Sequence, residues 1–324
     1  MPAPVSAVRA RNDFSACSGC SLCLLVCPVW RATRDPRMSP EGRAKGLQSG
    51  ADATELAVAV RACTLCGACE PVCPERIDLV GMTLGLRGLL ADTSDILALR
   101  DRLARTDGRA RDSHVLQENL LLCGAVLRNK VGLLARVLAL TGCSMVEDDG
   151  EDIVLAVEAG MEIPQARREA FLRPLRGART LVVENGLWLR PLRAWLPGVS
   201  MLGLGEALSS KPGVRRSLEK SDLYVIEPRA YHADYERLVG HYDILRAERR
   251  CAFNLDLQRI AIPATARGLG QSVQSEADDD EERARWMLRG HPVERIVLES
   301  EADRAGFLRL HGIPVVHLAE LADH

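Results

Sequence analysis

The chain has 324 residues, enough for two domains of ordinary size that each bury a core of their own. Its 42 basic and 44 acidic residues leave a formal net charge of -2. This balance excludes a broad cationic field for binding nucleic acid or anionic lipid, and it names no partner.

The cysteine content indicates a reducing compartment. Eleven cysteines would suggest disulfides in a small secreted protein, but residues 1–14 contain no apolar stretch of the signal-peptide kind. Apolar runs such as residues 131–140 are short and interrupted by Arg136, below the roughly 18 to 20 residues that a membrane-spanning helix requires. We therefore expect a soluble cytoplasmic protein, which could still lie at the inner face of the membrane through its partners.

Eight of the eleven cysteines lie in two runs near the start of the chain, both with the spacing C-x2-C-x2-C-x3-C-P. A 4Fe-4S cubane needs four thiolates at the corners of a tetrahedron. A short loop supplies three of them while its backbone N–H groups point at the sulfides. In two-cluster ferredoxins the last cysteine of each run binds the other cluster. The predicted ligands are Cys17, Cys20, Cys23 and Cys73 for one cluster, and Cys63, Cys66, Cys69 and Cys27 for the other.

Structural zinc and disulfides fit the two cysteine runs less well. Zinc favours two separated C-x2-C pairs and needs no evenly spaced third thiol. Disulfides conflict with the expected compartment. The doubled spacing therefore predicts two neighbouring 4Fe-4S clusters, an arrangement that favours electron transfer. Gly19 and Gly67 lie between ligands, where their conformational freedom lets N–H groups approach sulfur.

Helices are predicted around and after the cysteine runs. Residues 51–62 (ADATELAVAVRA) form a helical pattern that ends where the second run opens. Residues 78–142 are rich in Leu, Ala and Arg with few β-branched runs, which predicts several more helices. We therefore expect an α-helical, ferredoxin-like dicluster module at residues 1–95, followed by a helical connector at residues 96–146.

The rest of the chain, residues 147–324, alternates short apolar runs with helical stretches. This pattern predicts an α/β domain of degenerate strand-helix-strand repeats. In three passages, which begin at Thr180, Asp222 and Arg295, an apolar strand ends at a glutamate, a helix follows and a second apolar strand closes the unit. The acidic segment 271–283 is predicted to be a mobile loop.

The N-terminal half resembles a known group of redox subunits. The 35 residues between the two runs exceed the separation in small bacterial ferredoxins and resemble the helical ferredoxin module of respiratory dehydrogenases. The segment CPVWRATRDPRMSPEGRAK is similar to the C-P-V-Y and S-P-R-G-R motifs of iron-sulfur subunits of glycolate oxidase, lactate-utilisation, anaerobic glycerol-3-phosphate dehydrogenase and heterodisulfide reductase complexes. The second run, ACTLCGACEPVCPERIDL, resembles the same group. The matching residues of the first segment are Cys27, Pro28, Val29, Ser39, Pro40, Gly42 and Arg43, whereas Trp30 and Glu41 depart from the motifs.

The C-terminal half of that group usually contains two cysteine-rich repeats that hold a further iron-sulfur centre or act on a disulfide. Here the resemblance implies the same scaffold without the thiols, because Ala230 and Ala264 stand at motif cysteine positions and residues 300–303 contain none. It therefore implies a degenerate cysteine-rich-type domain used for docking. Isolated cysteines in apolar sequence are usually small buried hydrophobes. That is the role expected for Cys123, Cys143 and Cys251.

The resemblance implies an electron-transfer subunit without catalytic residues of its own. It would relay electrons through two 4Fe-4S clusters between a flavin-containing dehydrogenase subunit and a further redox subunit or carrier. No flavin or nucleotide is expected on this chain, and no nucleic-acid partner. Two alternatives stay open: a catalytic disulfide or quinone reductase subunit, and an iron-sulfur sensor. The missing cysteines count against the disulfide reaction only.

Overall fold

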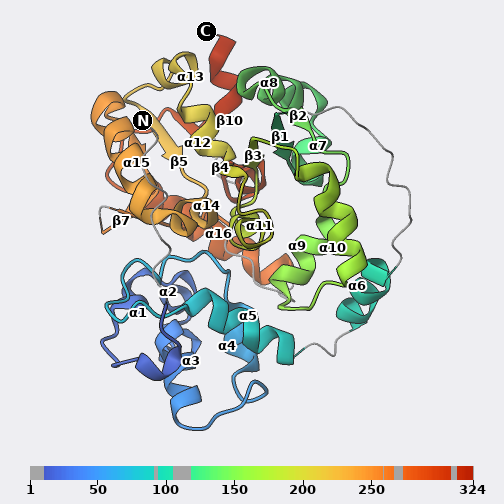
Figure 1. The fold of residues 1–324 in the computed structure, drawn as a ribbon. Coiled ribbons are helices and arrows are strands. Elements are labelled where there is room, and N and C mark those ends of the chain that lie inside the picture. Colours follow the sequence, from blue (N-terminus) through green and yellow to red (C-terminus); the bar gives the residue numbers. More distant parts are fainter. Residues whose placement is uncertain are drawn as a thin grey trace.

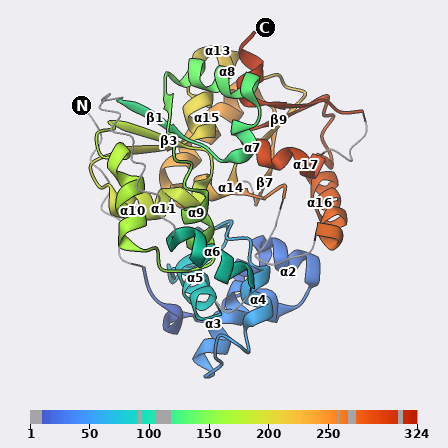
Figure 2. The same ribbon diagram turned by 90° about the vertical axis from the view of Figure 1, so that its right-hand side faces the viewer.

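The structure is a computed structural model that describes residues 11–90, 94–104, 118–257, 259–265, 273–307 and 312–323. It contains an N-terminal helical region and a larger α/β region built on parallel sheets. Figures 1 and 2 show the N-terminal helices grouped against one end of the α/β region. No described helix combines the length and the apolar character that crossing a bilayer requires.

The N-terminal region consists of short helices joined by the two cysteine loops. Pro28 and Pro40 stand at the first positions of two of them, where a missing N–H is tolerated. The predicted helix at residues 51–62 forms only from Ala57, after a series of turns. The elements are η1 (Phe14–Ala16), α1 (Leu22–Val26), α2 (Pro28–Thr33), η2 (Pro36–Met38), α3 (Pro40–Gln48), α4 (Ala57–Ala62) and α5 (Leu79–Leu89).

The α/β region contains two four-stranded parallel sheets with the same strand order. The first runs β2 (Ser144–Met145), β1 (Asn119–Leu122), β3 (Thr180–Val183) and β4 (Ser200–Gly203). The second runs β6 (Ala252–Phe253), β5 (Asp222–Val225), β9 (Arg295–Leu298) and β10 (Val315–His317). When the strands of each sheet are numbered along the chain, both follow the order 2-1-3-4. A short antiparallel pair, β7 (Leu255–Asp256) and β8 (Ile260–Ala261), follows β6.

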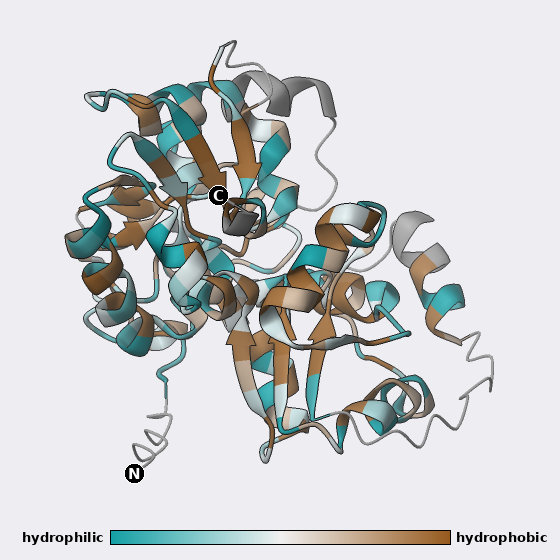
Figure 3. Ribbon diagram, turned by 90° about the horizontal axis from the view of Figure 1, so that it is seen from above, coloured by the Kyte–Doolittle hydropathy of each residue, from teal (hydrophilic) through white to brown (hydrophobic). Residues whose placement is uncertain are grey.

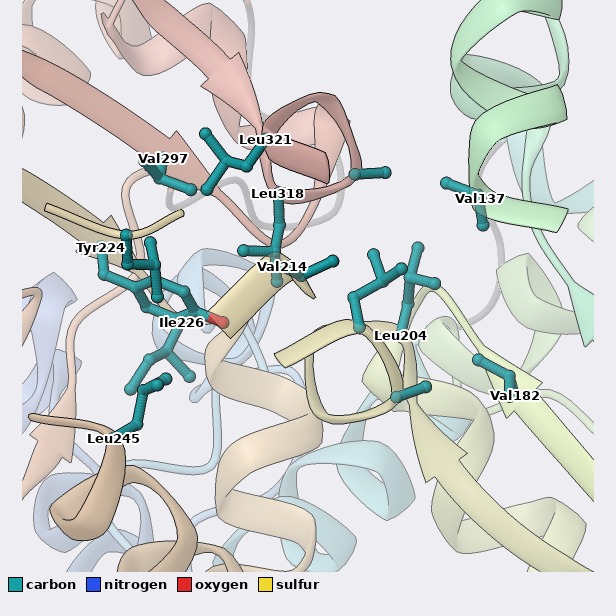
Figure 4. Packing of buried hydrophobic residues seen from close by; sticks show 14 of the residues in the cluster. Val137, Val182, Leu204, Val214, Tyr224, Ile226, Leu245, Val297, Leu318 and Leu321 are labelled. Carbon is teal, nitrogen blue, oxygen red and sulfur yellow. The ribbon is translucent and has the colours of Figure 1, made fainter. Parts of the chain in front are cut away.

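Helices cover both faces of each sheet, so successive strand residues enter different apolar clusters. In β3, Val182 belongs to the cluster between the two sheets, whereas Leu181 and Val183 belong to an outer cluster. Tyr224 and Val297 of the second sheet join the same inner cluster, which Figure 4 shows at close range. In Figure 3 these strands are among the most hydrophobic parts of the ribbon. Burial on both faces explains why the strands are continuous apolar runs.

The connecting elements of this region are mostly short. They are α6 (Ser94–Ala104), α7 (Ala125–Arg128), α8 (Val131–Thr141), α9 (Glu151–Glu158), α10 (Gln165–Leu172), η3 (Arg173–Leu175), η4 (Gly186–Trp188), α11 (Leu189–Trp195), α12 (Leu204–Ser209), α13 (Pro212–Arg216), α14 (Pro228–Ala233), α15 (Tyr235–Arg249), α16 (Val273–Leu288), η5 (Glu301–Asp303), α17 (Arg304–Phe307) and η6 (Leu318–Asp323).

The structure differs from the expected domain plan at the segment 96–146. This segment, predicted as a helical connector, contains β1 and β2, and β1 lies inside the first sheet between β2 and β3. The strand β1 is only four residues long and lies in Leu-rich sequence with a helical pattern. The composition of the segment therefore did not predict it. The α/β region therefore begins before residue 147.

Two further expectations about the C-terminal half are wrong. The second passage closes in the helix α15 rather than in a strand, because Leu238, Tyr242 and Leu245 are buried at helical spacing. The acidic segment predicted as a mobile loop lies within the helix α16 from Val273 onwards. Its acidic residues precede basic ones along the helix, the order that the helix dipole favours, and Arg285 pairs with Glu281 one turn away.

The two regions are in contact through a pair of glycines. A Cβ atom on Gly160 (φ +67°), just after α9, would lie 1.9 Å from the carbonyl oxygen of Leu84 and 2.7 Å from the backbone nitrogen of Gly88 in α5. A Cβ atom on Gly88 would in turn lie 2.5 Å from the carbonyl oxygen of Gly160. The backbone of α5 therefore approaches the α/β region too closely for any side chain.

We predict that Gly160→Ala lowers the free energy of unfolding by about 2 to 4 kcal/mol, because the methyl group meets backbone atoms and the left-handed conformation disfavours alanine. The matched control is Gly132→Ala in α8, where nothing lies within 4 Å of the new methyl group. That variant should be unchanged or slightly more stable. Denaturant unfolding of both variants measures the difference, and equal stabilities would contradict the close contact.

Candidate metal centre

The two cysteine loops share the positions of their left-handed residues. Left-handed residues occur two and four positions after the first cysteine of each run: Gly19 (φ 79°) and Ser21 (φ 62°) in the first, Leu65 (φ 54°) and Gly67 (φ 76°) in the second. Alternation of right- and left-handed residues turns successive N–H groups to one side, which forms a concave anion site. Two of the four residues are not glycine, and such backbone strain of about 1 to 2 kcal/mol per residue is typical of functional loops.

Backbone N–H groups also act on the thiols directly. Burial raises the pKa of Cys66 to about 11, and the N–H of Ala68 acts in the opposite direction by hydrogen bonding to the sulfur. Burial raises the pKa of Cys27 as well, while the N–H groups of Trp30 and Val29 lower it. These donors stabilise a negatively charged sulfur, so the loops suit thiolates bound to iron.

The structure brings the Cys27 thiol close to the second loop. The pKa of Cys69 is raised well above its usual range, first by burial, then by the neighbouring carboxylate of Glu70 and by the thiols of Cys66, Cys63 and Cys27. Cys27 and Cys63 likewise raise the pKa of Cys66. The predicted crossing of Cys27 to the second run is therefore compatible with its position.

In the first run, the thiols of Cys17 and Cys27 lie near that of Cys23. In Cys23, burial raises the pKa to about 12, and the Glu41 carboxylate and the thiols of Cys27 and Cys17 add to the rise. Cys20 is exposed, and Cys73 is half-buried. That Cys73 joins Cys17, Cys20 and Cys23 stays a prediction. Within the described parts of the chain, no three His, Cys, Asp or Glu side chains converge as ligands of a single metal ion.

The helix α3 connects both loops, and its motif residues have separate tasks. Ser39 caps the helix by accepting a hydrogen bond of 3.0 Å from the N–H of Gly42. A Cβ atom on Gly42 would lie 2.3 Å from the carbonyl oxygen of Pro36, so the turn before the helix requires glycine. Further along, Lys45 and Gln48 donate hydrogen bonds to the carbonyl oxygen of Cys17 in the first loop.

From the same helix, the Arg43 side chain reaches the second loop. It is 1% exposed and donates to the carbonyl oxygens of Met38 and Ala59, and its Nη2 lies 3.6 Å from the sulfur of Cys63. Burial of the Cys63 thiol acts to raise its pKa. The charges of Arg43 and Arg87, together with hydrogen bonds from the Leu65 N–H and the Thr83 side chain, outweigh burial, so the pKa of Cys63 is lowered. Two buried guanidinium groups therefore stabilise negative charge at this ligand.

The two loops differ in their surroundings. Beside Cys20, the side chains of Leu22 and Leu25 are 44% and 47% exposed, so the first loop lies at the surface. The second loop is covered by the α/β region. Its Cys66 and Ala68 form a buried apolar cluster with Val26 and Ile260. One predicted cluster would therefore lie close to solvent, and the other in the interior.

Polar groups of α14 hold the second loop at this contact. Arg229 donates a hydrogen bond of 2.9 Å to the carbonyl oxygen of Thr64. The Nδ1 atom of His232 lies 2.7 Å from the carbonyl oxygen of Cys66, and a Cβ atom on Gly67 would lie 3.0 Å from the Cβ atom of His232. Spacing along the sequence favours a surface or capping role for His232, but the side chain is 3% exposed. Only the short distance of His232 from Ala230, a position that the resemblance singles out, could have drawn attention to it.

The passages without motif cysteines also meet in space. Thr265, next to Ala264, donates a hydrogen bond of 3.0 Å to the carboxylate of Asp303, and the Glu227 carboxylate, close in sequence to Ala230, contributes to the raised pKa of Asp303. Carboxylates that follow strand ends complete the cluster. Glu299 accepts hydrogen bonds of 2.6 Å from the hydroxyls of Tyr224 and Tyr242. Buried carboxyl groups thus gather where these passages meet.

The three remaining cysteines pack as apolar side chains. Cys123, Cys143 and Cys251 are buried in the cluster between the sheets. Burial raises the pKa of Cys123 to about 11 and that of Cys251 to about 12, which keeps both thiols protonated at neutral pH.

Three buried carboxyl groups predict a pH dependence of stability. Burial raises the pKa of Glu184, Glu299 and Asp303 to about 7, from ordinary values of 4.5, 4.5 and 3.8. Between these values the three groups bind more protons in the native state than in the unfolded chain, so their contribution to the free energy of unfolding falls as the pH rises from about 4.5 to 8. Each group contributes on the order of 3 to 4 kcal/mol to this loss. Buried His232 and His317, whose pKa values are lowered to about 4, act in the opposite direction below about pH 6.5.

Denaturant titrations at several pH values measure this slope. Glu184→Gln should make the dependence of the free energy of unfolding on pH shallower, because one buried carboxyl group that ionises is removed. Glu169→Gln, in which the replaced side chain is 42% exposed, should leave it unchanged. Equal slopes in Glu184→Gln and the wild type would contradict the assignment.

The guanidinium group beside Cys63 predicts a redox effect. Arg43→Gln removes a buried positive charge, so the midpoint potential of one reducible centre should fall by on the order of tens of millivolts, because a neighbouring cation favours the more negative reduced state. Arg61→Gln, an exposed site on α4, should leave both potentials unchanged. Redox titration followed by electron paramagnetic resonance compares them, and equal potentials in the two variants would refute the effect.

Comparison with known proteins adds a family assignment for one part of the chain. A family model described as a 4Fe-4S dicluster domain matches residues 13–77, which include both cysteine loops and α3. No curated protein matches the chain, and no solved structure does. The chain thus contains a 4Fe-4S dicluster domain and is an iron-sulfur protein, which indicates a role in electron transfer.

Proposed function

We propose that this chain is the iron-sulfur subunit of a multi-subunit oxidoreductase. It would relay electrons between a flavin-containing dehydrogenase subunit and a further redox subunit or carrier. One observation carries the proposal: two loops with left-handed residues at matching positions, one exposed around Cys20 and the other buried against the α/β region. In such a pair, an electron can enter at the centre near the surface and pass to the second centre inside the protein.

The eight cysteines of the two runs would hold two 4Fe-4S clusters, with Cys27 and Cys73 exchanged between the runs. When bound, each cluster supplies a centre that is reduced and oxidised by one electron. The chain's own residues prepare the sites. The left-handed turns direct N–H groups at sulfur, Arg43 and Arg87 offset negative charge, and the packing around Cys66 excludes water.

The exposed apolar side chains beside Cys20 suit a protein partner. Leu22 and Leu25 lie next to a predicted ligand, where a docked redox subunit would cover them and shorten the path of the electron. We assign this face to the flavin-containing subunit. The α/β region, a degenerate relative of the cysteine-rich domain in the glycolate oxidase and heterodisulfide reductase group, would then position the second loop and bind the remaining partner.

The iron content tests the proposal. After anaerobic reconstitution, the wild-type chain should bind about eight iron atoms and eight sulfides, and the reduced protein should contain two paramagnetic centres. Cys20→Ala with Cys23→Ala should leave about four iron atoms, and so should Cys66→Ala with Cys69→Ala. Cys123→Ala is the matched control with a buried thiol outside the runs and should retain about eight.

Twelve or more iron atoms would show a further centre and contradict the proposed role of the C-terminal half. Purification of the tagged chain from its source under anaerobic conditions tests the partner. A co-purifying subunit with bound flavin is expected, and an isolated chain that reduces substrates without one would contradict the relay.

A further inference from the structure

The helix α3 brings opposite charges to the two cysteine loops. The backbone N–H of Glu41 donates a hydrogen bond to the sulfur of Cys23 in the first run, and the Glu41 carboxylate acts on the same thiol. Two positions further along, the Nη2 atom of Arg43 lies 3.6 Å from the sulfur of Cys63 in the second run. Because residues two positions apart on a helix do not face one another, one helix can bring an anion to one loop and a cation to the other.

Both side chains contain a buried polar atom that is not satisfied by the rest of the protein. The Oε2 atom of Glu41 and the Nε atom of Arg43 have no hydrogen-bond partner among the described residues. Unpaired buried polar atoms are costly and therefore rare. Capping of the helix does not explain the carboxylate, because Ser39 caps α3. The Nε–H group of Arg43 remains a free donor for a negatively charged group bound at the second loop.

The charges near the two loops differ in sum. At the first loop, Lys45 donates a hydrogen bond of 2.7 Å to the carbonyl oxygen of Cys17, so its cation offsets the Glu41 carboxylate. At the second loop, Arg87 adds another buried guanidinium group and donates to the carbonyl oxygen of Cys63. The first loop thus has one charge of each sign on its neighbouring helix, whereas the second loop has two cations.

A carboxylate near the second loop is neutralised by other residues. Glu70 adds to the raised pKa of Cys69, after burial. Its carboxylate pairs with Arg190 at 2.7 Å and also with Arg11. The excess of buried positive charge at the second loop therefore persists when Glu70 is included.

Burial acts against these cations, because a low-dielectric interior disfavours added negative charge. The thiols show how the two effects compare. Burial raises the pKa of Cys66, which is buried, to about 11. The pKa of Cys23 is raised to about 12, by burial and then by the Glu41 carboxylate, although Cys23 is only half-buried. At Cys63, the ligand that both guanidinium groups approach, neighbouring charge outweighs burial.

We propose that Glu41 and Arg43 give the relay a direction, with the lower midpoint potential at the first loop and the higher one at the second. The inference rests on the proposed electron-transfer function and adds that electrons move from the surface to the interior. One electron leaves the reduced centre of the first loop and reduces the oxidised centre of the second, so the step consumes no other reactant. The flavin-containing subunit then reduces the first centre again.

Redox titration of the cluster-loaded chain, followed by electron paramagnetic resonance, measures the gap between the two midpoint potentials. Glu41→Gln should raise the lower potential, and Arg43→Gln should lower the higher one. In each variant the equilibrium constant for electron transfer to the second centre should fall about threefold, which narrows the gap by about 28 mV at about 59 mV per tenfold. The matched control is Glu294→Gln, an exposed carboxylate just before β9, and it should leave the gap unchanged.

A gap that widens or stays unchanged in either loaded variant would overturn the proposal, while the relay stands because both centres are reducible. If Arg43→Gln retains fewer than eight iron atoms, Glu41→Gln decides alone. A rise of the lower potential then supports the proposal, and a rise of the higher potential, or no change, overturns it. If the wild type contains fewer than two reducible centres, the relay itself fails and the inference fails with it.

Discussion

Three carbonyl groups of the second cysteine loop depend on side chains from elsewhere in the chain. The carbonyl oxygens of Cys63, Thr64 and Cys66 accept hydrogen bonds from Arg87, Arg229 and His232 respectively. Arg87 belongs to α5, whereas the other two come from α14, more than 150 residues away. Because these bonds leave the N–H groups of the loop unobstructed, the loop can direct its donors at sulfur while its carbonyls face the protein. The interface between the two regions is thus part of the metal site.

The sequence predicted the parts of this arrangement that reside in local chemistry. The ligand spacing, the prolines that begin α2 and α3, and the glycine between Cys66 and Cys69 all have local causes. The strand β1 was missed because four apolar residues between helical patterns have no distinctive period. His232 was missed because its environment comes from a loop far away in the sequence. Pairings over such distances are set by packing, which residue types alone do not specify.

The C-terminal region buries carboxylates at equivalent positions of its two sheets. Both sheets have the order 2-1-3-4, and a glutamate follows the third strand in each, Glu184 in the first and Glu299 in the second. Tyrosine hydroxyls and backbone N–H groups satisfy these buried carboxylates. The C-terminal region therefore has a hydrogen-bonded acidic interior at these strand ends.

The difference in solvent exposure between the two cysteine loops also affects how easily oxygen reaches each of them. Iron-sulfur clusters are degraded where oxidants reach them, and the exposed Cys20 gives dissolved oxygen direct access to the first loop. The second loop lies behind α14, Ile260 and the hydrogen bonds of Arg229 and His232. Oxygen would therefore degrade a cluster in the first loop before a cluster in the second. Because the α/β region covers the second loop, the protein would stay folded with its inner cluster. The α/β region thereby protects the second cysteine loop.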